Sequence, residues 1–497
     1  MSAPEPPRGR GYVALCLAAL VLYAALSIGL SLNRVPICDE GWYASPALSL
    51  LTSGSMGSPV IEGAGTYLKG IERYTYWEMP LHAVVAAPWY RLFGPSLIST
   101  RMLSVIAGLA ALLCWFSILR RVTGDRSIAL IALLLTAIDS NVLILASTGR
   151  SDMLSAAFGA AALAAYLALR EDHLHWALFT GHACAVASGL THPQGGLIAV
   201  PSLILLQFYY DRHRFRWPQV IPIALPYLIG GAAWSAYILQ NPEAFWAQFS
   251  RNSAGRLWPL KSPLLALRRE ITDRILPAYG MLPAAHRVGR LRIVVPIVYV
   301  AAVLGLGWPR AVRRMPAARI IGGLIAIVVL VLVFLEGAKQ PWYLIHLSWL
   351  LAAAAAASYT WHTQRRPAWR PVCLGALAVL VLLQTGYAAA LIAEGRYAGV
   401  YRPVIAVLQR NMRPGELVIG SAELGFGLGF DRVLDDRRLG YYSHRMPRFI
   451  VVGEDYRQSL QQFRREQPEI AQYITGVLAS LYRPVFENDT YTVYARQ

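Results

Sequence analysis

Long apolar segments alternate with short polar ones over most of the chain, and this pattern predicts a bundle of membrane-spanning helices. A segment of about 20 apolar residues is long enough to cross a bilayer. The first such segment, Gly11–Leu32, follows Arg8 and Arg10, so we expect a retained helix whose N-terminus faces the cytoplasm. Arginine clusters recur between later apolar segments and set the direction of each span.

Eleven spans satisfy this rule if one short apolar segment, Leu81–Phe93, lies along the outer membrane surface. Counting Leu81–Phe93 as a span would move every later short-loop Arg cluster to the outer face, against the positive-inside rule. The expected spans are Gly11–Leu32, Ile98–Leu119, Ile128–Ala146, Met153–Leu169, Trp176–Leu190, Gly195–Tyr210, Val220–Leu239, Leu291–Trp308, Ile320–Leu335, Trp342–Trp361 and Val372–Ala393.

The hydrophobic pattern changes to that of a soluble α/β fold near Tyr397. We therefore expect a transmembrane domain at 1–396, with outer loops at 33–97 and 240–290, and a small extracytoplasmic α/β domain at 397–497. In this α/β domain the pattern predicts one helix, Tyr456–Glu466. It also predicts three strands, Glu416–Gly420, Arg448–Val452 and Thr490–Ala495. No catalytic motif is recognisable in this part, so a docking or lid role is expected.

Composition supports a polytopic membrane protein, because 56% of residues are hydrophobic and only 15% are charged. The net charge of +18 is spread in short Arg clusters between apolar segments, which topology and anionic lipids explain better than nucleic acid. Of the five cysteines only Cys38 reaches the outer side, so no intrachain disulfide is expected. Frequent Ala and Arg are typical of a GC-rich bacterial genome, and a bacterial inner-membrane location is expected.

Polar residues gather at the helix ends that this topology places on the outer side. Ionisable groups at membrane depth are costly and usually face a cavity or a partner. Paired carboxylates beside a membrane further suggest chemistry on a lipid-linked substrate. The set comprises Asp39, Glu40, Glu78, Arg150, Asp152, His192, Gln194, Glu336 and Lys339.

Each candidate also has a structural explanation. Asp39 precedes Gly-Trp-Tyr-Ala with one residue between, and is a suitable N-cap for a following helix. Comparable explanations exist for Glu78, Asp152, His192 and Lys339. Each of them could pair with a nearby charge or be an ordinary cap, membrane-interface or loop residue.

Six short motifs occur in order along about the first 360 residues: Asp39-Glu40-Gly-Trp-Tyr-Ala, Tyr76-Trp-Glu-Met-Pro-Leu81, Arg101-Met-Leu-Ser, Gly149-Arg-Ser-Asp152-Met-Leu, Gly189-Leu-Thr-His-Pro-Gln-Gly195 and Lys339-Gln-Pro-Trp-Tyr343-Leu-Ile. Their order, spacing and outer-face placement resemble the GT-C glycosyltransferases, and most closely the protein O-mannosyltransferase and aminoarabinose lipid A transferase families. The fold class implied is a polytopic α-helical membrane protein of GT-C type, with about eleven transmembrane helices.

The resemblance implies a transferase that takes a sugar from a polyprenyl-phosphate donor on the outer face. It implies that Asp39 is the catalytic acid or base, with Asp152 as the second outer acid and Glu78 as the first-loop glutamate. Glu40, beside Asp39, joins the catalytic candidates. The acceptor is expected to be lipid A or another glycolipid, a glycan or a protein.

One departure from the family pattern concerns the donor phosphate. The aminoarabinose transferases carry a Lys after the first-loop glutamate, where it meets this phosphate, whereas this chain has Met79. We therefore assign the phosphate to other cations, Lys339, Arg150 and Arg256. His192, Gln194 and Tyr343 complete the expected substrate-binding set.

The chemistry requires few groups, because a sugar on polyprenyl phosphate already carries its leaving group. A carboxylate must take the acceptor proton and cations must stabilise the departing phosphate; direct displacement then inverts the anomeric carbon. Glu78 with His192 or His286 is a candidate site for one divalent metal ion, although the spacing is not a recognised signature. The alternative function, a transporter or flippase of a lipid-linked sugar, predicts inverted repeats, and we find none.

Overall fold

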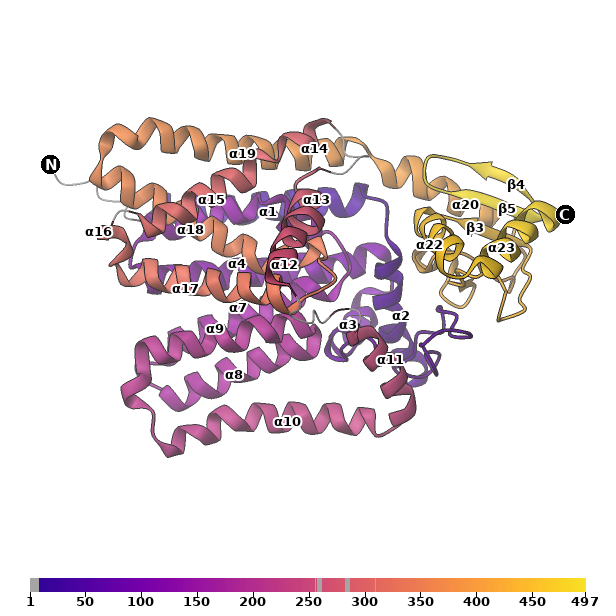
Figure 1. Ribbon diagram of the computed structural model, residues 1–497, viewed down its shortest axis with the longest axis horizontal. Helices are drawn as coiled ribbons and strands as arrows, with labels where there is room; N and C mark the ends of the chain where they lie inside the picture. The colour runs from indigo at the N-terminus through magenta and orange to yellow at the C-terminus, as the bar shows by residue number, and fades with distance from the viewer. Residues whose placement is uncertain (1–8, 255, 257–261, 282–286, 309) are drawn as a thin grey trace.

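The computed structural model describes residues 9–254, 256, 262–281, 287–308 and 310–497. Most of these residues form a long helical bundle, and a small sheet domain lies at one end of it (Figure 1). The α-helices up to the sheet domain are α1 (Arg10–Asn33), α2 (Cys38–Ser53), α3 (Leu81–Phe93), α4 (Leu97–Thr123), α5 (Arg126–Ala137), α6 (Ser140–Ala146), α7 (Ser151–Leu169), α8 (Leu174–Thr191), α9 (Pro193–Asp211), α10 (Val220–Ile238), α11 (Pro242–Ala254), α12 (Pro263–Arg269), α13 (Leu276–Ala278), α14 (Arg287–Leu291), α15 (Val294–Gly307), α16 (Arg310–Arg313), α17 (Pro316–Leu330), α18 (Ile345–Arg365) and α19 (Arg370–Ala393).

Eight helices among the described residues are long and apolar enough to cross a membrane. A ninth span is complete if α5 and α6, which are bent by 59° at their junction, are counted together. The two remaining expected spans correspond to α8 and α9, which pack side by side in the same bundle but are not among the eight. The chain is therefore a multi-helix membrane protein, and the side on which each loop lies stays a prediction.

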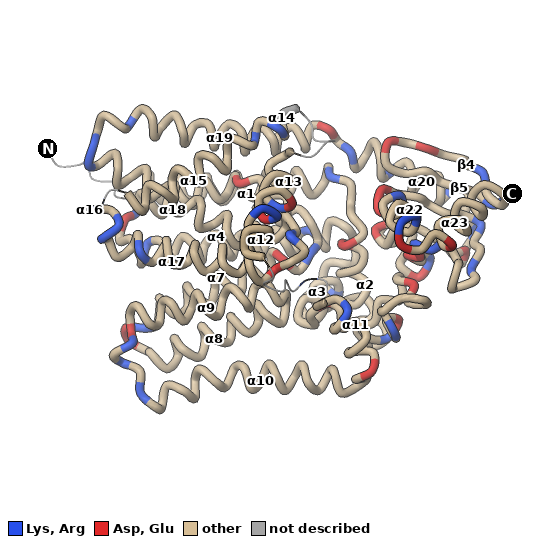
Figure 2. The backbone as a smooth tube through the Cα atoms, viewed as in Figure 1, with Lys and Arg blue, Asp and Glu red and all other residues tan. Residues whose placement is uncertain are grey.

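Small side chains allow the helices of the bundle to approach closely. The middle of α18 is a run of alanines, Ala352–Ala357, and every one of them is buried. Small residues are favoured between membrane helices because they bring the backbones into contact. Figure 2 shows charged residues mainly at the two ends of the bundle, with Lys and Arg prominent at the end opposite the sheet domain.

The first outer loop contains a helix, α2, which includes Pro46. The sequence allowed for a helix after Asp39 with Asp39 as its N-cap, but α2 begins at Cys38 with Ile37 at the N-cap position, so Asp39 lies within its first turn. Alanines explain its stability, since Ala44 and Ala47 pack against Ala83 and the other small residues of α3. The expected short helix Leu81–Phe93 is present with the same bounds as α3.

The sheet domain has five strands in the order β2-β1-β3-β5-β4. The strands are β1 (Val418–Ile419), β2 (Val433–Leu434), β3 (Phe449–Val452), β4 (Tyr482–Glu487) and β5 (Thr492–Arg496), and the helices are α20 (Arg402–Asn411), α21 (Gly425–Leu428), α22 (Glu454–Glu466) and α23 (Pro468–Leu481). β1 runs parallel to β2 and β3, whereas β5 is antiparallel to β3 and β4. The three predicted strands and the predicted helix are confirmed; the edge strands β2 and β4 were not predicted.

The sheet domain and the first outer loop share one hydrophobic core. Val60 and Ile61 of the loop are buried in the same cluster as Val404 and Val418 of the domain. Ile61 also forms a parallel bridge with Asp435, in effect extending the edge of the sheet. At Gly41 in α2, an added Cβ would lie 2.4 Å from the Ala422 carbonyl carbon. The domain is thus seated directly on the helix that carries Asp39.

Candidate active site

A cavity of about 240 Å³ lies where several helix ends converge. Its walls come from α2, the segment before α3, the first turns of α7 and α9, and the last turn of α11. Five of the residues expected to form the site line it together: Glu78, His192, Gln194, Arg256 and Tyr343. The convergence of distant motifs predicted from the sequence is therefore present in the fold.

A chain of hydrogen bonds crosses one wall of this cavity. Arg256 Nη1 donates to the Tyr343 hydroxyl at 2.8 Å, and the hydroxyl lies 3.4 Å from His192 Nε2. The backbone N–H of Gln194 donates to His192 Nδ1 at 3.2 Å, so a neutral ring carries its proton on Nε2. Burial lowers the pKa of His192 to about 4, which keeps the ring neutral at pH 7. His192 therefore orients Tyr343 and adds no charge.

Arg256 is the cation best placed for an anionic substrate group. Its Nε donates to Asn252 Oδ1 at 3.0 Å, and its backbone carbonyl accepts from Gly337 N–H. Among the described residues, no carboxylate forms an ion pair with Arg256. A half-buried guanidinium without a carboxylate partner, on a cavity wall, is suited to bind phosphate oxygens.

Glu78 and Gln194 present polar atoms that lack a partner within the described residues. Glu78 Oε1 and Gln194 Nε2 are both buried without a hydrogen bond. Burial raises the pKa of Glu78 well above its usual range; Arg256 opposes this shift, while Asp152 adds to it. This shift favours the protonated form of Glu78, which can donate a hydrogen bond to a substrate oxygen.

Arg150 joins two of the predicted acids behind the cavity. One guanidinium nitrogen forms an ion pair with Asp39, and Nε donates to Asp152 Oδ2 at 2.8 Å. The guanidinium also lies 5.6 Å from the ring centroid of Tyr43, a residue of the cavity wall. Asp152 is buried, but the Asp39 side chain is 25% exposed. None of these three residues lines the cavity itself, and of the two acids Asp39 is the more accessible.

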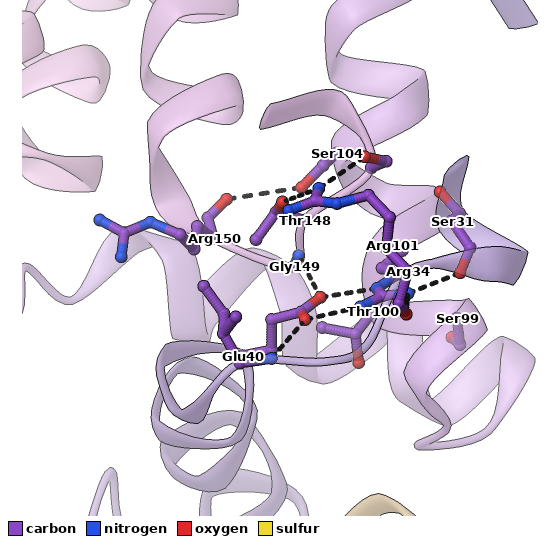
Figure 3. Close-up of polar contacts among 12 residues, drawn as sticks. Ser31, Arg34, Glu40, Ser99, Thr100, Arg101, Ser104, Thr148, Gly149 and Arg150 are labelled. Atoms are coloured by element: carbon purple, nitrogen blue, oxygen red, sulfur yellow. Dashed lines mark hydrogen bonds and ion pairs between the residues drawn. The ribbon is translucent and has the colours of Figure 1, made fainter. Parts of the chain in front are cut away.

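Glu40 does not lie free beside Asp39 (Figure 3). Arg101 donates to both carboxylate oxygens at 2.8 Å, and the backbone N–H groups of Gly149 and Ile37 donate to them at 2.8 and 3.1 Å. Burial acts to raise the pKa of Glu40, but these bonds hold it below its usual range. In this arrangement both oxygens of Glu40 are already bonded, and the catalytic role expected for it stays a prediction.

The structural work of Glu40 is to fix the start of α2. Arg101 Nη1 donates in addition to the Ser31 and Arg34 carbonyls, at 2.6 and 3.0 Å. The pair therefore ties together the end of α1, the first turn of α2, α4 and the segment before α7 (Figure 3). Asp39 lies in the first turn of α2 and Arg150 lies in the segment before α7. The Glu40–Arg101 pair therefore fixes the relative position of Asp39 and Arg150.

Lys339 does not face the cavity. Its Nζ donates to the Leu332 and Val333 carbonyls at 2.8 and 2.7 Å, and lies 3.2 Å from Glu270 Oε2. The ammonium group thus has two hydrogen bonds and one ion pair, in a buried cluster that also contains Arg274 and Glu336. In this arrangement Lys339 is bound to the carbonyls of the turn Val331–Leu335, and the expectation that it binds the donor phosphate stays a prediction.

A metal site is not evident in the part of the chain that the structure describes. No group of three or more His, Cys, Asp or Glu side chains there is arranged to hold an ion. Of the residues considered from the sequence, Glu78 and His192 both line the cavity, while His286 lies outside the described residues.

Several cavity residues were not selected from the sequence, among them Tyr43, Ser151 and Asn252. The first two lie inside motifs whose charged members drew attention. Asn252 belongs to α11, which was treated as loop, although Phe245, Phe249 and Asn252 recur at helical spacing and Phe249 also lines the cavity. That spacing was the signal that could have identified this wall.

Comparisons with known proteins agree with this architecture. The model of a family described as dolichyl-phosphate-mannose-protein mannosyltransferase matches residues 78–236, whereas a search of curated proteins found no match. The structure of ArnT from Cupriavidus metallidurans bound to undecaprenyl phosphate is similar, with a TM-score of 0.61 and 17% identity over 98% of each chain.

An oligosaccharyltransferase from Archaeoglobus fulgidus is similar in its apo form, with a TM-score of 0.54 and 15% identity, over 94% of this chain and 69% of that one. The oligosaccharyltransferase AglB from Archaeoglobus fulgidus, in complex with an inhibitory peptide and a dolichol-phosphate, gives a TM-score of 0.50 and 14% identity, over 94% of this chain and 69% of that one. These likenesses confirm the predicted GT-C fold of a polytopic α-helical membrane protein.

Proposed function

We propose that this protein is a membrane glycosyltransferase that transfers a sugar from a polyprenyl-phosphate donor to an acceptor hydroxyl. The observation that carries the proposal is the cavity wall with Arg256 and Tyr343, next to the Asp39–Arg150 ion pair. One side is suited to a phosphate and the other to a reacting hydroxyl. The similar structures of ArnT and AglB, which hold undecaprenyl phosphate and a dolichol-phosphate, support a lipid-phosphate donor.

The reaction balances with these groups alone. The acceptor oxygen attacks the anomeric carbon while the bond from that carbon to the phosphate oxygen breaks. The acceptor proton passes to the Asp39 carboxylate, which acts as general base. Polyprenyl phosphate leaves with the bonding electron pair, and Arg256 and the Tyr343 hydroxyl stabilise the added negative charge. Attack opposite the leaving group inverts the anomeric carbon.

The remaining residues position these groups. Arg150 holds the Asp39 carboxylate while Asp152 holds Arg150, so the base has a fixed direction. The Glu78 carboxyl group and the side-chain amide of Gln194, which both have an atom without a partner among the described residues, are placed to bind hydroxyl groups of the sugar. The buried setting strengthens each of these polar contacts and keeps water from competing with the acceptor. We place the reaction on the outer face of a bacterial inner membrane, with a glycolipid, glycan or protein as acceptor.

The test uses the full chain in nanodiscs, with a panel of sugars on polyprenyl phosphate and candidate acceptors from bacterial envelopes. We expect a glycosylated product together with one equivalent of released polyprenyl phosphate. Nucleotide sugars in lipid-free conditions serve as the comparison and should give no product. Transfer from a nucleotide sugar would refute the proposed donor. Movement of the intact donor across vesicles without release of polyprenyl phosphate would favour a flippase instead.

A further inference from the structure

A second cavity, of about 470 Å³, lies in the bundle between α15, α18 and α19. All three helices belong to candidate membrane spans, so this cavity is within reach of the bilayer. Most of its lining is apolar and comes from facing helices, including Ile297, Ala301, Leu304, Ala376 and Leu377. None of its lining residues takes part in the cavity around Tyr343, so the two sites are distinct.

Two tryptophans mark one end of this second cavity as the membrane surface. Trp308 follows α15 and Trp369 precedes α19; both line the cavity and are 79% and 50% exposed. Exposed tryptophans at the ends of membrane helices are typical of the boundary between the hydrocarbon layer and water. Between them, His362 Nε2 bonds the Gly305 carbonyl at 3.0 Å and joins α18 to α15. The cavity therefore extends from this boundary into the hydrocarbon layer.

Three exposed arginines stand at the same boundary. Arg310 begins α16 directly after the Trp308 end of α15, Arg366 follows α18, and Arg370 is the first residue of α19. Within the described ranges of the chain, none of the three forms an ion pair. Figure 2 shows Lys and Arg residues at the end of the bundle opposite the sheet domain, where α16 lies. Unpaired guanidinium groups at head-group depth attract anionic lipids.

We propose that this second cavity binds an anionic phospholipid, with one acyl chain between α15 and α19 and the phosphate held by Arg366 and Arg370. Each part of the site matches one part of the ligand. The apolar walls accept a hydrocarbon chain, the tryptophans lie at the level of the glycerol, and the arginines neutralise the phosphate. A neutral lipid or an apolar protein helix would fill the cavity but would leave the three arginines without a counter-charge. This site is independent of the proposed transferase reaction.

The test measures lipid binding by native mass spectrometry of the full chain, titrated with phosphatidylglycerol or phosphatidylcholine of identical acyl chains. The double variant Arg366→Gln/Arg370→Gln removes the head-group contacts and, at about fivefold per arginine, should weaken phosphatidylglycerol binding about 30-fold. Ala376→Phe fills the cavity and should weaken binding of both lipids. The matched control, Arg120→Gln/Arg121→Gln, removes the same charge from two exposed residues of α4 and should change binding less than about twofold.

Three outcomes would overturn the proposal. Equal loss of phosphatidylglycerol in the two arginine double variants would mean that only the overall charge attracts the lipid. Phosphatidylcholine binding to the unaltered protein as tightly as phosphatidylglycerol would remove the role of the arginines. Unchanged lipid binding by a folded Ala376→Phe protein would place the acyl chain elsewhere. Because the arginines are exposed, their variants remain informative even if the alanine variant does not fold.

Discussion

The carboxylate of Asp39 and the guanidinium of Arg150 form an ion pair between the first turn of α2 and the residue that precedes α7. Neither residue owes its position to the other alone. Arg150 is also held by Asp152, and α2 is held by the bonds between Glu40 and Arg101. The proposed base, Asp39, is thus held in place by residues that do not themselves react. Substitutions can distinguish the base from these positioning residues.

Asp39→Asn should fold and reach the membrane but transfer sugar about 10²–10⁴-fold more slowly, because the amide cannot accept the acceptor proton. The measurement is single-turnover transfer by protein of verified thermal stability. Asp125→Asn is the matched control, since Asp125 caps α5 with bonds to two backbone N–H groups and lies outside the cavity. Near-normal turnover of a well-folded Asp39→Asn protein would remove Asp39 from the mechanism.

Arg256→Gln should lower kcat/KM for the donor about 10- to 100-fold, because a charged hydrogen bond to the phosphate is lost. Its acceptor KM should change little. Arg251→Gln, at an exposed position of α11 five residues before Arg256, provides the control and should behave as the unaltered protein. An equal loss in both variants would show that the overall charge of this part of the chain acts on the donor, without a specific contact from Arg256.

Glu40→Gln should destabilise the folded protein by about 3–5 kcal/mol, because it leaves the buried Arg101 guanidinium without its counter-charge. Thermal unfolding in detergent measures the effect. The control, Glu243→Gln, breaks the ion pair between Glu243 and Lys69, two side chains that are both mostly exposed. It should lower the free energy of unfolding by at most about 1 kcal/mol. If Glu40→Gln unfolds at the normal temperature but transfers sugar slowly, Glu40 acts directly in catalysis and its structural role is refuted.

The contact between the sheet domain and α2 should weaken as pH rises. Burial and nearby Asp455 raise the pKa of Glu423 to about 8, and burial raises that of Asp435, which accepts from Trp42 Nε1, to about 6. The docked state binds these protons more tightly than the undocked state, so stability is greatest at low pH and falls through pH 6–8. Thermal unfolding at pH 5.5–8.5 measures this trend.

The matched pair for this pH dependence is Glu423→Gln and Glu454→Gln. Glu423→Gln should flatten the loss of stability above pH 6, because the amide stays neutral. Glu454 is exposed on α22, and its substitution should leave the dependence intact. Stability that rises between pH 6 and 8 in the unaltered protein would contradict the assignment.

The sequence predicted the features that depend on local pattern. Apolar length predicted the spans, alternation predicted β3 and β5, and the order of short motifs predicted the fold and the convergence of Glu78, His192 and Tyr343. It did not predict the bounds of α2, because Gly41 and Pro46 disfavour a helix unless tertiary contacts stabilise it. Alanine packing against α3 and the close approach of Ala422 supply those contacts.

The direction of charged side chains was beyond prediction for a related reason. Glu40 and Asp39 are neighbours in sequence, yet one is fully bonded to Arg101 and the other is partly exposed. Lys339 lies in a family-like motif, but its ammonium is used by backbone carbonyls released in a distorted turn. Both outcomes depend on partners from remote segments, and no local spacing in the sequence specifies those partners.

The shared core of the first outer loop and the sheet domain has a consequence for how the protein is made. Val60 and Ile61 emerge early from the ribosome, whereas Val404 and Val418, which cover them, emerge after the last long helix. The loop that carries Asp39 therefore cannot complete its packing until the end of the chain has been delivered to the same side of the membrane. The site is therefore completed late in synthesis. A chain truncated within its final hundred residues would contain the helices of the bundle but would lack the packing that holds the loop of Asp39.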